Sequence, residues 1–197
     1  MTGSQAPERR RRADAQRSIG AILDAAIAVL ARRPDASMEE IARRAGVSRQ
    51  TVYAHYPSRE ALIRAVQQRA LAETIAAMDA AELHVGPAAA ALDRLVRAGW
   101  QTLERYPLLM DVRAEMTADE EFALHHPILD RLERLVRRGQ RRGEFDRAMP
   151  ASWLLSSFLA LSHAAAEEVR AGRMTADSAL AALRESIFRV YGVTDPP

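Results

Sequence analysis

Helix starts and stops follow one another closely between Ser37 and Pro57, in the stretch SMEEIARRAGVSRQTVYAHYP. Ser37 and Glu40 stand at the spacing of a capping box, in which each side chain bonds an unpaired backbone N–H at the start of a helix. Gly46 suits the left-handed turn that ends a helix, and Ser48 can cap the next one. Pro57 then stops that second helix, because proline lacks the N–H that a helix interior needs. The stretch is predicted to fold as two short helices joined by a tight turn.

Longer helices are expected on both sides of this pair. Apolar residues at helical spacing predict a first helix from about Ala15 to Arg32, and Ser58 can cap a fourth helix that begins at Arg59. Between them, the second short helix runs from about Arg49 to Tyr56 and turns Val52 inward. This is the helix-turn-helix layout, in which the second short helix enters the major groove of DNA.

The remainder of the chain is also predicted to be helical, because alanine and leucine are abundant and β-branched runs are rare. Proline and glycine residues divide it into separate helices. These are expected at residues 88–105, at 108–116, in a helix that has Pro127 near its start and ends at Arg142, at 151–171 and at 176–191. The fold class is therefore all-α, with about nine helices in total and no internal repeat.

Charge is distributed unevenly along the 197 residues. Residues 1–66 contain 12 arginines against 7 acidic residues, whereas residues 67–197 contain 16 arginines against 19 acidic residues. A basic first third joined to a mildly acidic remainder is typical of a chain with one nucleic-acid-binding end. Cysteine is absent, which excludes a disulfide scaffold, thiolate catalysis and cysteine-bound zinc.

Three segments are expected along the chain: a flexible basic arm over 1–14, a helix-turn-helix DNA-binding domain over 15–66, and an effector-binding and dimerisation domain over 67–197. The run Arg9–Arg12 either enters a minor groove of DNA or acts as a non-specific electrostatic tail.

The run Arg9–Arg12 and the apolar stretch Ile19–Ala31 together imitate a secretory signal, but Asp24 interrupts that stretch. No stretch approaches the roughly 18 unbroken apolar residues of a membrane helix, so we expect a cytoplasmic protein without a membrane partner.

The sequence EEIARRAGVSRQTVYAHYPSREAL resembles the DNA-binding domain of TetR/AcrR-family regulators. The family pattern is a capped "IA..AGVS" followed by "T.Y.HF..KE.L", and the second half of that pattern is matched by Thr51, Tyr53, His55, Glu60 and Leu62. Tyr56 and Arg59 replace the usual phenylalanine and lysine and keep the chemistry close. Ala54 stands where a larger residue, often tyrosine, is common, a difference that affects either a phosphate contact or base recognition. The resemblance extends from Ile19 to Leu62.

The resemblance implies an all-helical homodimer. In members of this family, the last two helices form a four-helix bundle with the partner, and the middle helices enclose a ligand pocket. The implied function is that of a repressor that binds a palindromic double-stranded DNA operator and is released by a small, largely apolar effector. The alternative is a protein interaction module that kept the helix-turn-helix fold without sequence-specific DNA binding. Such a module is expected to lose the polar outer face of residues 49–55, which this chain retains.

Polar side chains of the second short helix are the candidates for DNA contact. Arg49 and Gln50 lie at its N-terminal end, where arginine suits the edge of guanine and glutamine that of adenine; the alternative is that both contact phosphates or water. Thr51 can touch a thymine methyl or a phosphate. Tyr53, His55 and Arg59 are phosphate contacts by resemblance, with core packing as the alternative for Tyr53. The full predicted DNA-binding set is Ser37, Ser48, Arg49, Gln50, Thr51, Tyr53, His55, Tyr56 and Arg59.

Aromatic, methionine and histidine side chains of the second domain are candidates for an effector pocket, although the same residue types also make ordinary core. The predicted effector-binding set is Trp100, Tyr106, Met110, Met116, Phe122, His126, Trp153 and Phe158, with His125 beside it. Small and apolar residues of the last two helices are candidates for the dimer interface, with burial inside the chain as the alternative. The predicted dimer set is Ala164, Ala165, Leu180, Leu183, Ile187 and Tyr191.

No cofactor, metal or enzymatic activity is expected. His163 and Glu167 share one helix face, but two ligands are too few for a metal site. A helical carboxylate enzyme would need paired Glu-x-x-His motifs, and the sequence contains none.

Overall fold

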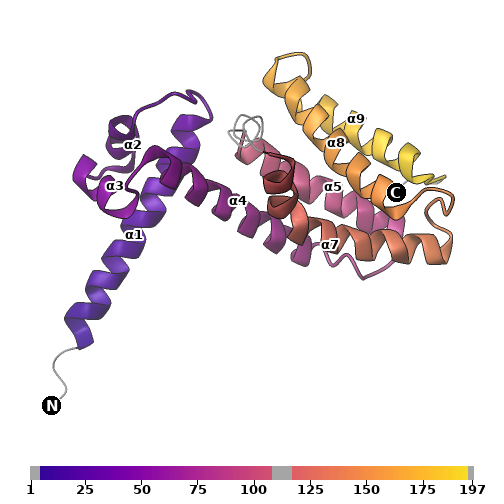
Figure 1. Ribbon diagram of the computed structural model, residues 1–197, viewed down its shortest axis with the longest axis horizontal. Helices are drawn as coiled ribbons and strands as arrows, with labels where there is room; N and C mark the ends of the chain where they lie inside the picture. The colour runs from indigo at the N-terminus through magenta and orange to yellow at the C-terminus, as the bar shows by residue number, and fades with distance from the viewer. Residues whose placement is uncertain (1–4, 108–116, 195–197) are drawn as a thin grey trace. The chain divides into compact units, whose positions relative to one another are not determined.

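The computed structural model describes residues 5–107 and 117–194, and the regular elements within these ranges are all α-helices (Figure 1). They are α1 (Gln5–Leu30), α2 (Met38–Ala45), α3 (Arg49–His55), α4 (Arg59–Ala80), α5 (Ala88–Arg105), α7 (Ala118–Arg142), α8 (Ala151–Arg170) and α9 (Ala176–Tyr191). The all-α prediction is confirmed. The helix predicted at 108–116 lies outside the described residues. None of the described helices combines the length and the apolar character needed to cross a membrane.

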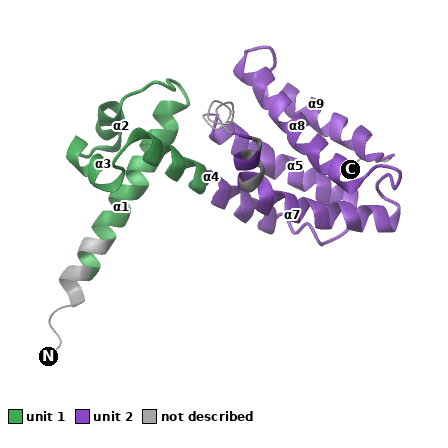
Figure 2. Cartoon of the chain, viewed as in Figure 1, with its two compact units in different colours: residues 1–69 green, residues 70–197 purple. Residues whose placement is uncertain are grey.

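The chain divides into two compact units, residues 1–69 and residues 70–197 (Figure 2). The division falls within α4, whose first part belongs to the first unit and whose remainder belongs to the second. The domain boundary predicted after residue 66 lies in the same helix.

The first unit is held together by a small apolar core that all four of its helices share. Each helix contributes side chains that are almost fully buried: Ile22 and Leu30 from α1, Ile41 from α2, Val52 from α3, and Leu62 and Val66 from α4. Burial of such a side chain contributes about 1.5–3 kcal/mol. On the surface of this unit, Arg69 of α4 forms an ion pair with Asp24 of α1 at 2.9 Å. The two short helices are therefore fixed against a packed base.

The start of α1 differs from the prediction. The helix begins at Gln5 rather than near Ala15, so most of the segment predicted as a flexible arm is helical. Arginine and alanine both have high helix propensity, and Asp14 and Arg17 form an ion pair one turn apart. The early start of α1 follows from this local preference, because an arginine-rich segment can remain polar on every side and still be helical.

The start of α7 also differs from the prediction. Pro127 was expected near the beginning of this helix, but α7 begins at Ala118 and contains Pro127 in its interior. The helix starts at a second capping box, in which Thr117 accepts from the backbone N–H of Glu120 and the Glu120 carboxylate accepts from the N–H of Thr117. These hydrogen bonds hold the pKa of Glu120 below its usual range, with the Thr117 backbone N–H as the largest cause.

The second unit packs α5, α7, α8 and α9 around one apolar core, to which α4 contributes Met78. α8 and α9 lie side by side and pack along their lengths (Figure 1). The Tyr191 hydroxyl of α9 donates to the carbonyl of Leu154 in α8 at 2.9 Å, and its ring meets that of Phe145 edge-on with centroids 5.3 Å apart. Burial raises the pKa of Tyr191. Gly143 and Gly192 end α7 and α9 in the left-handed conformation, which side chains rarely adopt.

Candidate nucleic-acid interface

The turn between α2 and α3 is built by the caps that the sequence predicts. The Ser37 hydroxyl accepts from the N–H of Glu40 at 3.2 Å, and the Glu40 carboxylate accepts from the N–H of Ser37 at 2.8 Å. Gly46 closes α2 with φ of 69°, in the left-handed region that favours glycine. Ser48 then caps α3 by accepting from the N–H of Thr51 at 3.0 Å. The direction of α3 is therefore set by local hydrogen bonds as well as by the core below it.

α3 has one buried side and one exposed side. Val52 is fully buried in the core of the first unit. Arg49, Gln50 and Tyr53 are exposed, and Tyr53 retains 38% of its surface. A seven-residue helix held by one apolar residue, with polar groups over the rest of its surface, has the form of a helix that docks into a groove.

Two pairs of side chains at α3 are held in place by contacts within the protein. The Arg49 guanidinium lies over the Tyr53 ring, with Cζ 5.3 Å from the ring centroid. The hydroxyls of Ser48 and Thr51 are 2.8 Å apart and bond to one another. The stack leaves the donors of Arg49 at the edge of the guanidinium plane available, and these donors match the two acceptors of a guanine edge.

Two members of the predicted DNA-binding set do not lie on this exposed side. Tyr56 is only 8% exposed, and burial is the main cause that raises the pKa of its hydroxyl. The Arg59 guanidinium donates to the backbone carbonyls of Pro34 and Ala36, so it ties the start of α4 to the segment before α2. The structure gives both residues a scaffold role, and their predicted contact with DNA remains untested.

The surface beside α3 carries arginines that the sequence analysis did not single out. Arg43 and Arg44 occupy the last turn of α2, and both are exposed. They form no hydrogen bond or ion pair with any residue that the structure describes. The signal for them was present, because they stand on the polar side of the same amphipathic helix as Ile41 and Met38.

The single carboxylate that closes the capping box is held ionised. The pKa of Glu40 lies below its usual range, first because it accepts the Ser37 backbone N–H and next because it pairs with Arg33. A negative charge at the start of α2 is favourable for the helix dipole. It lies in the first turn of α2, whereas Arg43 and Arg44 occupy the last turn, so the end of α2 that leads into α3 remains positive.

The predicted effector-binding residues are distributed over different environments in the second unit. Trp100, Tyr106 and Phe158 are buried, and Trp100 and Phe158 belong to the same core. Trp153 is instead 58% exposed, so it does not line an interior pocket of the protomer. His126 is exposed, with Nδ1 3.4 Å from the Asp130 carboxylate. Met110 and Met116 lie outside the described residues, and the side chain of Phe122 is not described.

The predicted dimer stripe faces inward for the most part. Leu183, Ile187 and Tyr191 are at most 3% exposed and pack within their own unit, whereas the contact of the set with a partner stays a prediction. Helical spacing identifies an apolar face but not the element that covers it, and here α8 and the core cover it. Ala165 is also buried, Leu180 is half-buried, and Ala164 is exposed.

The histidines do not form a metal centre among the residues that the structure describes. His125 and His163 meet edge-on with ring centroids 5.5 Å apart. No group of three or more histidine, aspartate or glutamate side chains able to hold a metal ion occurs within the described ranges.

Comparison with known proteins gives both sequence and structural matches. Residues 22–66 match the family profile described as bacterial regulatory proteins, tetR family. The chain is 37% identical over 161 residues to the HTH-type transcriptional repressor LfrR of Mycolicibacterium smegmatis (strain ATCC 700084 / mc(2)155), which covers 80% of this chain and 82% of that protein.

Solved structures extend the match over nearly the whole chain. The crystal structure of the TetR-like transcriptional regulator LfrR from Mycobacterium smegmatis in complex with proflavine matches with a TM-score of 0.70 at 29% identity, over 89% of this chain and 96% of that one. The fatty acid degradation regulator FadR from Bacillus halodurans matches with a TM-score of 0.73 over 91% of this chain and 97% of that one. Its identity of 17% makes it a match of fold alone.

Proposed function

The chain belongs to the TetR family of bacterial regulatory proteins, and from that membership we propose that it is a homodimeric transcriptional repressor that binds a palindromic DNA operator and is released by a small, largely apolar effector. The observation that carries the DNA-binding half is the exposed side of α3. Arg49 and Gln50 stand at the N-terminal end of a capped helix. Its one buried residue, Val52, anchors it to the core of the first unit.

Base recognition is assigned to the first turn of α3. Arginine bonds guanine and glutamine bonds adenine in the major groove, and each good bidentate pair contributes about 1–3 kcal/mol of discrimination. Tyr53, His55, Arg43 and Arg44 supply phosphate contacts that fix the register of the helix in the groove. Two copies of α3 in a dimer then meet half-sites about 34–36 Å apart, which is one turn of DNA.

The second unit is assigned to effector binding. LfrR, the relative with 37% identity, has been solved in complex with proflavine. The buried aromatic rings of Trp100 and Phe158 belong to one core in this unit, and such rings are the usual lining of a site for an aromatic ligand. α4 runs without interruption from one unit into the next, so a shift of this helix offers a route by which effector binding changes operator affinity. Such coupling must be reciprocal between effector and DNA.

The partner copy is assigned to the exposed side of α8. Trp153, Ala160 and Ala164 are exposed and recur at helical spacing along this helix. Exposed small residues allow close approach of a second helix, and an exposed tryptophan at one end offers a large apolar contact. This face replaces the inward stripe of α9 as the expected contact between protomers.

Selection of bound sequences from a random duplex pool tests the proposal. The purified full-length chain should enrich a two-fold symmetric site, and fluorescence anisotropy on that site should show weaker binding when proflavine is added. The variant R49A/Q50A should enrich no defined site while keeping the thermal unfolding midpoint of the wild type. Failure of the wild type to enrich any sequence at low salt, with or without proflavine, contradicts sequence-specific binding. If the chain also shows no salt-dependent binding to non-specific DNA, the interaction-module alternative is favoured.

A further inference from the structure

Arginines line one groove of the second unit, far along the chain from the DNA-binding helices. The groove has a volume of about 570 Å³ and is bordered by the end of α4, the turn that follows it, and α7. Its lining consists of Met78, Asp79, Leu83, His84, Arg131, Arg134, Leu135, Arg137, Arg138 and Arg141. This lining contains five arginines and one aspartate. None of its residues belongs to the predicted effector-binding set.

The positive charge is a local exception. Residues 70–197 contain 15 arginines against 19 acidic residues, so the second unit as a whole is net negative. Arg131, Arg134, Arg138 and Arg141 recur at the spacing that places residues on one side of a helix. A run of like charges on one helix side is unfavourable in the free protein.

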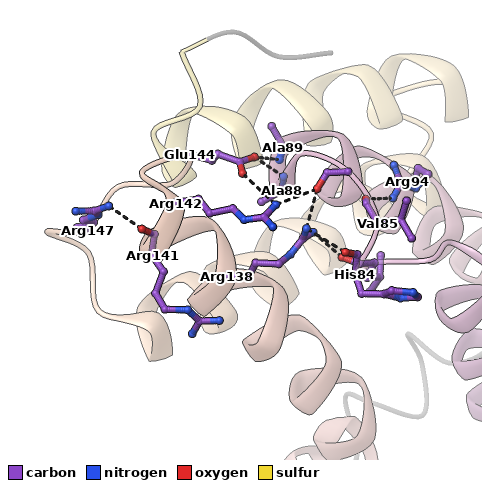
Figure 3. Close-up of polar contacts among 12 residues, drawn as sticks. His84, Val85, Ala88, Ala89, Arg94, Arg138, Arg141, Arg142, Glu144 and Arg147 are labelled. Carbon is purple, nitrogen blue, oxygen red and sulfur yellow. Dashed lines mark hydrogen bonds and ion pairs between the residues drawn. The ribbon is translucent and has the colours of Figure 1, made fainter.

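Part of this charge is used within the fold. Arg131 forms two hydrogen bonds to the Asp79 carboxylate, at 2.9 and 3.1 Å. Arg138 donates to the backbone carbonyls of Leu83, His84 and Gly86 at 2.6–3.2 Å, which fixes the turn after α4 (Figure 3). Burial and the neighbouring Arg142 lower the pKa of Arg138.

The other three arginines of the groove differ in whether they are bonded within the protein. Arg137 pairs with Glu133 on its own helix at 2.8 Å. Neither the Arg134 nor the Arg141 guanidinium forms a hydrogen bond or ion pair with a residue in the described ranges. In Figure 3 the Arg141 side chain extends away from the bonded cluster around Arg138. Two guanidinium groups therefore face the groove with all their donors available.

We propose that this groove binds a small anion, namely a carboxylate, sulfonate or phosphate group carried on an apolar body, with Arg134 and Arg141 as the groups that hold the charge. Guanidinium groups bond such oxyanions through two parallel N–H donors. Met78 and Leu135 are at most 2% exposed and form an apolar floor for the rest of the ligand. The volume lies in the range of small-molecule sites, which favours a small ligand over an extended polyanion.

The site does not depend on the proposed DNA binding, because its test measures ligand binding alone. The probe is 8-anilinonaphthalene-1-sulfonate, whose fluorescence rises on binding, and its uncharged counterpart is N-phenyl-1-naphthylamine, which has the same aromatic body. The wild-type full chain should bind the sulfonate more tightly than the neutral compound. R134Q/R141Q should weaken sulfonate binding about tenfold and leave the neutral compound unchanged.

Two further variants separate the site from general charge and from misfolding. R97Q/R173Q removes two exposed arginines outside the groove and should leave sulfonate affinity within about twofold of the wild type. D79N removes the acid that occupies Arg131 and should strengthen sulfonate binding while leaving binding of the neutral compound unchanged. A misfolded variant that exposes apolar surface would instead bind both compounds more strongly.

Equal sulfonate affinity in the wild type and R134Q/R141Q overturns the proposal, and so does an equal loss in R97Q/R173Q. A third outcome also overturns it: if R134Q/R141Q leaves sulfonate binding intact but lowers retention of the chain on immobilised heparin, the groove docks a polyanion instead.

Discussion

The Arg49 guanidinium lies over the ring of Tyr53 on the exposed side of α3, with Cζ 5.3 Å from the ring centroid. The two residues are four positions apart, so they stand one above the other on the same helix side. A stacked guanidinium keeps its plane in one orientation, and this orientation determines which base edge its donors can meet. The pair therefore links a residue expected to contact phosphate to the one expected to read a base.

Replacement of Arg49 by alanine should relax sequence preference at one base pair of each half-site. The expected loss is about 1–3 kcal/mol of discrimination at that position, with smaller changes at the others. Anisotropy titrations on the selected operator and on duplexes with single base-pair changes measure it. Y53F, which keeps the ring below Arg49, is the matched control and should retain the preference. A preference that survives in R49A would assign base reading to another residue.

Replacement of Arg43 and Arg44 by glutamine should weaken binding to all DNA sequences alike. Each phosphate contact that is lost reduces the slope of log affinity against log salt by about one. The measurement is a set of titrations between low and moderate salt, on the selected operator and on an unrelated duplex. R173Q removes an arginine from the second unit and should leave the slope unchanged. An unchanged slope in R43Q/R44Q would place both side chains outside the DNA contact.

Replacement of Gly46 by alanine should destabilise the helix-turn-helix through the backbone alone. Gly46 has φ of 69°, and an added Cβ would meet no other atom within 4 Å, so the cost comes from the left-handed conformation. That cost is about 1–2 kcal/mol. Gly20 lies inside α1 with open space around it, and G20A should instead stabilise by about 0.5–1 kcal/mol. Urea unfolding of the two variants should therefore give midpoints on opposite sides of the wild-type value.

The sequence predicts where the short helices begin and end, but it does not predict which element packs against each helix face. Ser37, Gly46 and Ser48 specify their local geometry through their own side chains or lack of one, and the structure confirms the caps they predict. Ile187 and Tyr191 form an apolar stripe at the predicted spacing, but they pack inside the protomer because α8 covers them. Periodicity describes one helix, and burial depends on a second element distant in sequence.

The same limit applies to individual polar and aromatic side chains. Arg59 matches a family position, yet its guanidinium reaches the carbonyls of Pro34 and Ala36, which come close only once the fold has formed. Trp153 has the character of a pocket residue but lies on the exposed side of α8. The spacing of Arg131, Arg134, Arg138 and Arg141 along α7 is present in the sequence. The groove beside them depends on where α4 ends, which the spacing does not predict.

Stability below neutral pH should depend on the carboxylate of Glu40. Its pKa is lowered in the folded state, so its ionised form stabilises the fold at pH values above the ordinary glutamate pKa, and that contribution is lost as pH falls through the lowered value. The difference in stability between the wild type and E40Q should be present at neutral pH and disappear in this acidic window. E39Q removes a carboxylate from the same turn without touching the capping box and is the control.

Replacement of Gly139 by alanine should destabilise the second unit, because a Cβ at this position would overlap the ring of Phe145. Phe145 is 2% exposed and also packs edge-on against Tyr191, so its ring has little room to move. Overpacking of this kind costs about 1–3 kcal/mol. The change should appear as a lower urea midpoint, whereas G99A in α5, where an added Cβ meets nothing within 4 Å, should not lower it.

A second substitution isolates the contact as the cause. In the G139A background, F145L should recover part of the lost stability, although F145L alone removes buried aromatic surface and destabilises the wild type. The coupling between the two changes, measured in a double-mutant cycle, is then stabilising. Additive effects of the two substitutions would show that Gly139 is required for a reason other than its contact with the Phe145 ring.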